Sequence, residues 1–124
     1  QLTTCGKYVY VYLWATWCGG CLAEMPAFGQ LVEKYKDDPR IDFISISMDS
    51  AKDHDKWVKK VKDDNHSWKN FIVPGDFESA IAKEYSITGI PRFLLFDPQG
   101  VLINIRANKP SDPETVKYLD SLLK

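Results

Sequence analysis

The sequence predicts one three-layer domain of the α/β class, in which a central mixed β-sheet lies between helices on both faces. Buried-strand patterns alternate with helical patterns in the order β-α-β-α-α-β-β-α along the 124 residues. A strand, a crossover helix and a second strand at the start predict a parallel pair. Two strands joined by a short turn near the end predict an antiparallel pair. A chain of this length suits a single domain around one core, spanning residues 1–124.

The first strands and helix follow from apolar patterns. Residues 7–14 (KYVYVYLW) are dense in β-branched and aromatic residues, with apolar side chains on both faces, as in a central strand covered on two sides. The next segment has apolar side chains at gaps of three and four, which form the stripe of an amphipathic helix. These side chains belong to Leu22, Met25, Phe28, Val32 and Tyr35. Residues 41–47 (IDFISIS) then predict a second buried strand.

The middle of the chain predicts two more helices. Residues 52–64 (KDHDKWVKKVKDD) are typical of a polar surface helix that docks through Trp57, Val58 and Val61. Its many charges are most simply a solvated face. A further helix is expected over residues 77–85, where aromatic and apolar residues recur four apart.

A hairpin and a helix close the domain. Residues 92–96 (RFLLF) and 101–106 (VLINIR) are predicted strands, joined by the turn sequence DPQG with proline second and glycine fourth. Ser111 begins the segment SDPE, which combines a capping-box pattern with an early proline and so predicts the start of the last helix. The buried stripe of that helix consists of Val116, Leu119 and Leu123.

Composition excludes several classes of function. The net charge is −1, so no basic field indicates a nucleic-acid partner. Hydrophobic residues make up 44% of the chain, which argues against disorder. No apolar run approaches the roughly 20 residues that span a bilayer. Because the chain starts at Gln1 rather than at methionine, we interpret it as the C-terminal part of a longer precursor, and the lack of a targeting segment is uninformative.

The stretch WATWCGGC contains the pair Cys18 and Cys21, which has three possible meanings: half of a metal site, a structural clip or a redox couple. A zinc site needs two more ligands, and the only histidines, His54 and His66, lie twelve residues apart. A structural bridge across four residues removes little entropy from the unfolded chain. A redox couple is therefore favoured, with no metal and no cofactor. Cys5 is interpreted as a solitary structural or semi-exposed thiol, with a regulatory or intermolecular role as the alternative.

The position of the pair, between a buried strand and a helix, matters more than its spacing. Free N–H groups and the dipole at a helix N-terminus favour negative charge, so a thiol there is expected to have a lowered pKa. Since the thiolate is the nucleophile of disulfide exchange, Cys18, which is nearer the turn, is the expected attacker. Cys21 lies about one helical turn inward and is suited to resolving a mixed disulfide.

Several motifs together resemble the thioredoxin superfamily: WATWCGGC, the GIP of residues 89–91, and Pro26 five residues after Cys21. The segment CLAEMP, the long excursion between SISMD and YSITGIP, and FLLFDPQGVLI resemble its TlpA/ResA-like branch of extracytoplasmic thiol–disulfide oxidoreductases. The resemblance covers essentially the whole chain. It implies a thioredoxin-like fold.

The resemblance also implies roles beside the cysteines. Pro91 matches the family's cis-proline, and the backbone around Ile90 is expected to pair with an incoming extended peptide. Trp17 is expected to form an apolar platform around Cys18. Arg92 stands where thioredoxins usually have threonine. An inward guanidinium there would favour the thiolate, and an outward, solvated one is an equal alternative.

Glu24 is a candidate proton acceptor, because it follows Cys21 by three residues and shares its helix face. Related ResA-like proteins carry glutamate at this place, although an ordinary surface glutamate is the alternative. Thioredoxins have a buried aspartate where this chain has Tyr12. That acceptor is therefore missing, which favours Glu24 as its substitute.

The implied function is an enzyme that reduces protein disulfides on the extracytoplasmic side, in the periplasm or cell envelope. Its partners would be protein disulfide or dithiol substrates and a membrane thiol–disulfide electron donor, with a membrane tether outside this sequence. One alternative is a non-catalytic thioredoxin-fold binding module of a larger envelope protein. Another is a peroxide-reducing relative, although the Thr/Cys-Pro context usual for peroxidatic cysteines is absent around Cys18.

Overall fold

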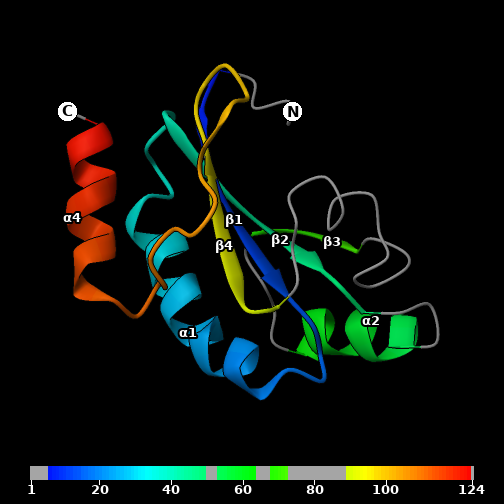
Figure 1. Cartoon of the computed structure of the whole chain (residues 1–124). Helices are drawn as coiled ribbons and strands as arrows, with labels where there is room; N and C mark the ends of the chain where they lie inside the picture. Colours follow the sequence, from blue (N-terminus) through cyan, green and yellow to red (C-terminus); the bar gives the residue numbers. More distant parts are fainter. Residues whose placement is uncertain (1–5, 50–52, 64–67, 73–88, 124) are drawn as a thin grey trace.

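A computed structural model describes residues 6–49, 53–63, 68–72 and 89–123 of the chain. Within these ranges it has five strands and three helices (Figure 1). In chain order they are β1 (Tyr8–Trp14), α1 (Gly19–Lys34), β2 (Ile41–Ser47), α2 (His54–Asp63), β3 (Lys69–Ile72), β4 (Arg92–Phe96), β5 (Leu102–Asn104) and α4 (Pro113–Leu122).

The strands form one mixed sheet in the order β3-β2-β1-β4-β5. Strand β1 pairs in parallel with β2, and β2 pairs in parallel with β3. Strand β4 is antiparallel to both β1 and β5. The mixed sheet predicted from the sequence is therefore confirmed, and β1 is its central strand.

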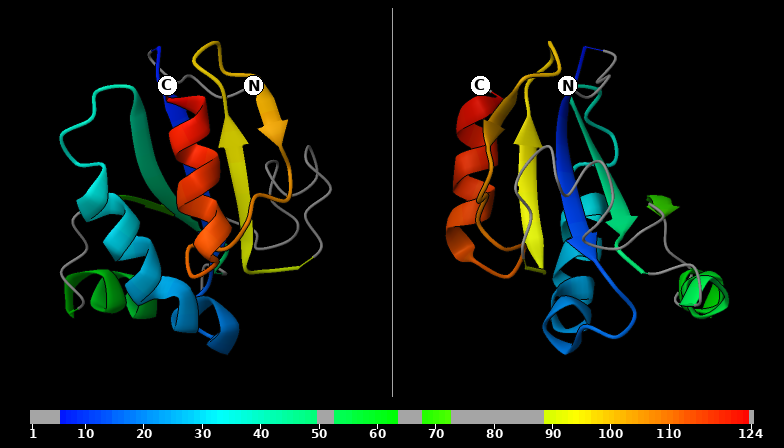
Figure 2. Two further views of the ribbon diagram at one scale, coloured as in Figure 1. Left: turned by 90° about the vertical axis from the view of Figure 1, so that its left-hand side faces the viewer. Right: turned by 45° about the vertical axis from the view of Figure 1, so that its right-hand side comes forward.

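Side chains on one face of the sheet and the helices form the larger of two apolar clusters. Tyr10, Tyr12 and Trp14 of β1 belong to it, together with both cysteines of the CxxC pair. Helices α1 and α4 lie side by side on this face, and Leu119 of α4 is fully buried there (Figure 2). Trp57 and Val61 of α2 pack against the same cluster, as the sequence predicts, but the third predicted docking residue, Val58, is 43% exposed.

The other face of the sheet carries the second cluster. It consists of alternate residues of the three central strands and of Met48: Val9, Val11, Leu13, Ile44, Ile46, Met48, Leu94 and Phe96. The alternation follows from the two-residue period of a strand, and both faces are apolar because β1 lies at the centre of the sheet. The helix expected over residues 77–85 lies outside the described residues.

Three elements of the structure differ from the prediction: β3, β5 and α4. Strand β3 was not predicted. It has only four residues at the edge of the sheet, and Lys69, Asn70 and the half-exposed Phe71 do not form the apolar pattern of a buried strand. Strand β5 is shorter than predicted: the side chain of Asn104 accepts a hydrogen bond from the N–H of Arg106, and the chain turns there. The strands β1, β2 and β4 match their predicted ranges within one residue.

The last helix begins one residue later than the capping-box pattern predicts. Its N-cap is Asp112, whose carboxylate accepts a hydrogen bond from the N–H of Glu114, and Pro113 occupies the first turn. The predicted cap, Ser111, is thereby free to bond elsewhere, and it contacts Glu24 of α1.

Replacing Phe28 by alanine is expected to lower the free energy of unfolding by about 3–5 kcal/mol. Its fully buried ring lies 5.0 Å from the ring of Tyr12 and 4.9 Å from that of Trp68, measured between centroids. Denaturant unfolding of the oxidised protein measures the loss. Phe71→Ala, at a half-exposed ring, is the control and should cost less than about 1 kcal/mol. Equal losses for the two variants would contradict this description of the core.

Candidate functional site

A disulfide joins Cys18 and Cys21 where β1 gives way to α1, with the two Cα atoms 5.2 Å apart. This is the carboxyl end of the central parallel strand, the edge at which open α/β sheets generally bind ligands. Cys21 is fully buried, whereas Cys18 is 8% exposed. The accessible sulfur is therefore that of Cys18, although most of it is covered in the disulfide form.

Cys18 is the N-cap residue of α1. Its backbone is extended, with φ −95° and ψ 104°, and its sulfur accepts a hydrogen bond from the N–H of Cys21 over 3.1 Å. A helix N-terminus presents unpaired N–H groups and a partial positive charge. When the disulfide is reduced, the same groups stabilise a thiolate on Cys18 relative to a thiol.

A buried carboxylate holds the turn that leads into Cys18. Asp49, fully buried just beyond β2, accepts hydrogen bonds from the N–H of Thr16 at 3.1 Å and from its hydroxyl at 2.7 Å. The hydroxyl of Ser47 donates to the same carboxylate at 2.5 Å. The chain before Cys18 is thus tied to the end of β2. Sequence reasoning missed Asp49; the available signal was an acidic residue directly after a buried strand.

The peptide bond between Ile90 and Pro91 is cis, as the family resemblance implies. The carbonyl oxygen of Ile90 lies 3.8 Å from the sulfur of Cys18. A Cβ atom added to Gly20 would lie 3.6 Å from Cδ of Pro91, so this proline packs against the first turn of α1. The structure therefore brings together Cys18, Ile90 and Pro91, which are far apart in the sequence.

Trp17 and Arg92, two further candidates from the sequence, lie in different surroundings. Trp17 is 52% exposed and directly precedes Cys18. Arg92 is buried at the start of β4, where it pairs with Leu13 of β1. By the alternation of a strand, its side chain shares a face with Leu94, on the side of the sheet opposite the cysteines. Burial, and then the positive charge of Arg106, lower the pKa of Arg92.

Tyr12 occupies the place of the aspartate found in thioredoxins. It is fully buried, and its hydroxyl donates a hydrogen bond to the carbonyl oxygen of Cys21. Burial raises the pKa of Tyr12 far above its ordinary value, and the nearby carboxylate of Glu24 raises it further. Tyr12 is therefore a neutral hydrogen-bond donor beside Cys21 and not a base.

Glu24 has a partner that the sequence did not reveal. Its carboxylate accepts one hydrogen bond from the N–H of Ser111 at 3.0 Å and another from the Ser111 hydroxyl at 2.7 Å. This partly buried carboxylate is close enough to the hydroxyls of Tyr10 and Tyr12 to raise the pKa of both, after the larger effect of burial. Glu24 thus connects the interior of the site to the segment before α4.

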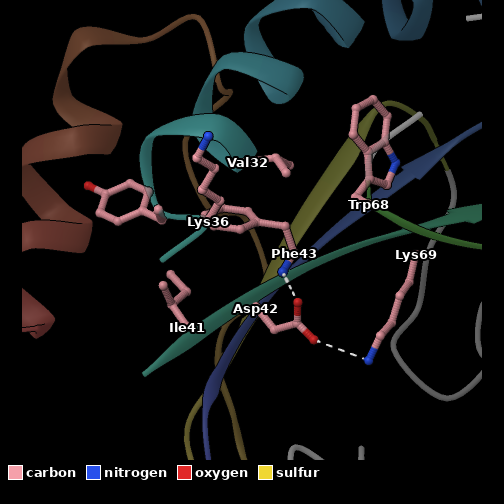
Figure 3. Close-up of a pocket in the computed structure, with 8 residues that line it drawn as sticks. Val32, Lys36, Ile41, Asp42, Phe43, Trp68 and Lys69 are labelled. Atoms are coloured by element: carbon pink, nitrogen blue, oxygen red, sulfur yellow. Dashed lines mark hydrogen bonds and ion pairs between the residues drawn. The ribbon is translucent and has the colours of Figure 1, made fainter. Parts of the chain in front are cut away.

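A cavity of about 220 Å³ lies at the amino end of β2, away from the disulfide (Figure 3). Val32, Phe43 and Trp68 supply its apolar walls. Of its two lysines, Lys69 lies 3.6 Å from the Asp42 carboxylate, and Lys36 lies 2.6 Å from that of Glu33. The cavity is smaller than the roughly 300 Å³ of a usual ligand site, so we assign no site there.

Metal ligands do not gather in the described part of the chain. Residues 6–49, 53–63, 68–72 and 89–123 contain no group of three or more His, Cys, Asp or Glu side chains that could hold a metal ion. His54 lies exposed on α2, while Cys5 and His66 fall outside these ranges. Nor is any helix among the described residues long and apolar enough to cross a membrane.

Comparison with known proteins agrees with this geometry. A model of a thioredoxin-like family matches residues 6–102. The thioredoxin-like protein YneN of Bacillus subtilis is 27% identical over 115 residues, which cover 93% of this chain and 65% of that protein. The thiol-disulfide oxidoreductase ResA of Bacillus thuringiensis is 28% identical over 117 residues, covering 94% and 64%. The chain thus spans slightly less than two thirds of these curated relatives.

Solved structures with the same fold include two of Bacteroides vulgatus, each assigned as a thiol-disulfide oxidoreductase. The solution structure is 38% identical with a TM-score of 0.81, and the match covers 97% of this chain and 76% of that one. The crystal structure is 32% identical with a TM-score of 0.80, covering 94% and 78%. Both similarities extend over nearly the whole chain.

Replacing Tyr12 by phenylalanine is expected to cost about 1 kcal/mol of stability through the lost hydrogen bond. The pH dependence of exchange with a small disulfide reagent should keep its shape between roughly pH 6 and 9, because Tyr12 stays protonated throughout. Tyr10→Phe is the matched control, since that hydroxyl donates to the Asn108 carbonyl instead. A shifted pH profile in the Tyr12 variant alone would show that its hydroxyl titrates during exchange.

Proposed function

This chain belongs to the thioredoxin-like family, and we propose that it catalyses thiol–disulfide exchange through Cys18 and Cys21. The observation that carries the proposal is the Cys18–Cys21 disulfide at the N-terminus of α1, with the accessible sulfur hydrogen-bonded to a helix N–H group. The similarity to proteins named thiol-disulfide oxidoreductases supports it.

The proposed reaction begins with the dithiol form. The Cys18 thiolate attacks a disulfide of the substrate; a new sulfur–sulfur bond forms to Cys18, and the second substrate sulfur leaves as a thiolate that takes up a proton. Cys21 then loses its proton and attacks the sulfur of Cys18. The mixed disulfide breaks, and the other substrate thiol is released. Two electrons pass to the substrate, and the Cys18–Cys21 disulfide remains.

A dithiol donor must then return two electrons to this disulfide. We propose that the donor is a membrane thiol–disulfide protein and that the chain works on the extracytoplasmic side, in the periplasm or cell envelope. The resemblance of its motifs to the TlpA/ResA-like branch supports this direction and location. No metal or cofactor takes part in the proposed exchange, because both steps are displacements at sulfur.

Substrate is proposed to approach Cys18 along the surface formed by Trp17, Ile90 and Pro91. The exposed indole of Trp17 offers apolar contact area beside the attacking sulfur. The backbone at Ile90 is proposed to pair with an extended substrate segment. Arg92 receives no role in this scheme, because its side chain shares the face of the sheet opposite the cysteines.

The second displacement needs a proton acceptor, because Cys21 is fully buried and its thiol is shielded from water. We assign this role to Glu24, one helical turn beyond Cys21. Tyr12 cannot take the proton, because its raised pKa keeps its hydroxyl protonated and a protonated phenol is not a base. Ser111 is a positioning residue in this scheme: its two hydrogen bonds fix the carboxylate of Glu24.

The Cys21→Ser variant is expected to accumulate a covalent adduct when mixed with a disulfide-bonded peptide, because Cys18 attacks and nothing resolves the mixed disulfide. Intact-mass spectrometry measures the adduct, and dithiothreitol should release it. Cys18→Ser is the control and should form none. If both variants bound the peptide without any adduct, the chain would be a binding module rather than an exchange enzyme.

Glu24→Gln is expected to slow the resolving step by about 10²-fold at neutral pH and to change its pH dependence, because the amide cannot accept the proton. Single-turnover release of the second peptide thiol measures this step.

Ser111→Ala should cause a smaller change of the same kind, since one of two hydrogen bonds to Glu24 remains. Its matched control is Ser121→Ala, whose hydroxyl donates within its own helix to Tyr118 at 2.6 Å. An unchanged pH–rate profile in Glu24→Gln would exclude Glu24 as the acceptor.

A further inference from the structure

A groove of about 360 Å³ lies directly beside the turn that carries the disulfide. Thr16 and Trp17 form one wall, and residues of α2 and of the position before it form the other. Trp17, which forms part of the wall, immediately precedes Cys18 in the chain, so the groove borders the residue next to the attacking cysteine. All the residues that line the groove belong to the described part of the chain.

The topology explains why α2 borders the active site. The chain runs from β1 through α1 to β2, and from β2 through α2 to β3, always moving in the same direction across the sheet. Right-handed crossovers therefore put α1 and α2 on the same face, which agrees with the packing of Trp57 on the larger cluster. The amino ends of both helices lie near the carboxyl ends of the parallel strands, where the disulfide also lies.

The wall formed by α2 presents positive charge to solvent. Lys56 has 74% of its side chain exposed, whereas Asp53, which lies 3.4 Å from its ammonium group, is only 15% exposed. Lys59 projects from the same wall and pairs at 2.8 Å with the exposed carboxylate of Asp63. Exposed ion pairs of this kind contribute only about 0–1 kcal/mol, so both lysines can exchange these partners for a carboxylate of a ligand.

The whole of α2 likewise carries more positive than negative side chains. Between His54 and Asp63 it carries four lysines and two aspartates, in a chain whose net charge is −1. The opposite wall of the groove is the indole of Trp17, half of which is exposed. Large exposed aromatic side chains are typical anchors at protein interfaces. An aromatic wall facing a lysine-rich wall fits a segment that combines apolar and acidic side chains.

We propose that this groove is the substrate-docking site and that it selects polypeptide segments carrying acidic side chains next to their disulfide. The inference rests on the proposed exchange function and names its preferred class of substrate. Carboxylates of the segment pair with Lys56 and Lys59, while its apolar parts contact Trp17. The substrate disulfide is thereby held beside Cys18. Charge complementarity of this kind acts mainly on the rate of association and on the choice of partner.

The test uses three synthetic peptides that share one disulfide and differ only in the residues flanking it, which are acidic, neutral or basic. The reduced protein should react with the acidic peptide about 10-fold faster than with the basic one at low salt, measured as the second-order rate of thiol release. The difference should shrink at about 0.5 M salt, because the charges are exposed.

Lys56→Glu should abolish the preference for the acidic over the basic peptide, because a carboxylate then replaces one of the two lysines that pair with the acidic side chains. Its matched control is Lys117→Glu on α4: Lys117 is also 74% exposed and lies 3.3 Å from a carboxylate three residues away, so the change in net charge is the same. An unchanged far-UV circular dichroism spectrum verifies that each variant is folded.

The outcomes separate the two proposals. Equal rates of the unaltered protein with all three peptides would overturn the docking site and leave the exchange function intact. An equal change of preference in the Lys56 and Lys117 variants would also overturn it, because net charge alone would then explain the selectivity. Failure of the unaltered protein to reduce even the neutral peptide would overturn both the exchange function and the docking site that rests on it.

Discussion

The contact between the N–H group of Cys21 and the sulfur of Cys18, 3.1 Å long, is the interaction on which the site depends. It places one sulfur at the N-terminus of a helix, where negative charge is favoured. The surrounding structure holds both ends of this contact. Asp49 ties down the turn before Cys18, and the hydroxyl of Tyr12 bonds to the carbonyl of Cys21. Ile90 brings its carbonyl within 3.8 Å of the sulfur from a third direction.

The two sulfurs lie in different environments. This difference fits the two steps of the proposed exchange reaction, in which one cysteine attacks the substrate and the other resolves the mixed disulfide. Cys18 is preceded by the exposed Trp17, which also lines the groove beside α2 that we propose as the route of the substrate. The Cys21 side is closed by the core, and the charged group nearest along its helix face is Glu24. In the proposed exchange, attack by Cys18 and resolution by Cys21 therefore use different parts of the fold. The central strand β1 supplies both, since it leads into the cysteine turn and carries Tyr12.

Local sequence patterns predicted the elements whose position depends mainly on neighbouring residues in the chain. The strands β1, β2 and β4 carry apolar residues on both faces, and the CxxC pair stands at a strand–helix junction that is visible in the sequence. The partners of Asp49 and Ser111 were not predictable, because Thr16 and Glu24 lie 33 and 87 residues away from them. The capping pattern assigned Ser111 to the N-terminus of α4, so its hydrogen bonds to Glu24 were not expected. The orientation of Arg92 likewise followed only from its place in the sheet.

The most direct test of an activated Cys18 is the pH dependence of its alkylation in the reduced protein, followed separately for each cysteine by mass spectrometry. A sulfur stabilised by the N-terminus of α1 should react as a thiolate well below pH ~8.5, the ordinary value for a thiol, while Cys21 stays unreactive. If Cys18 ionised only at or above about pH 8.5, and reacted no faster than Cys21, the helix would not activate it. The fold would then carry the cysteine pair without its proposed chemistry.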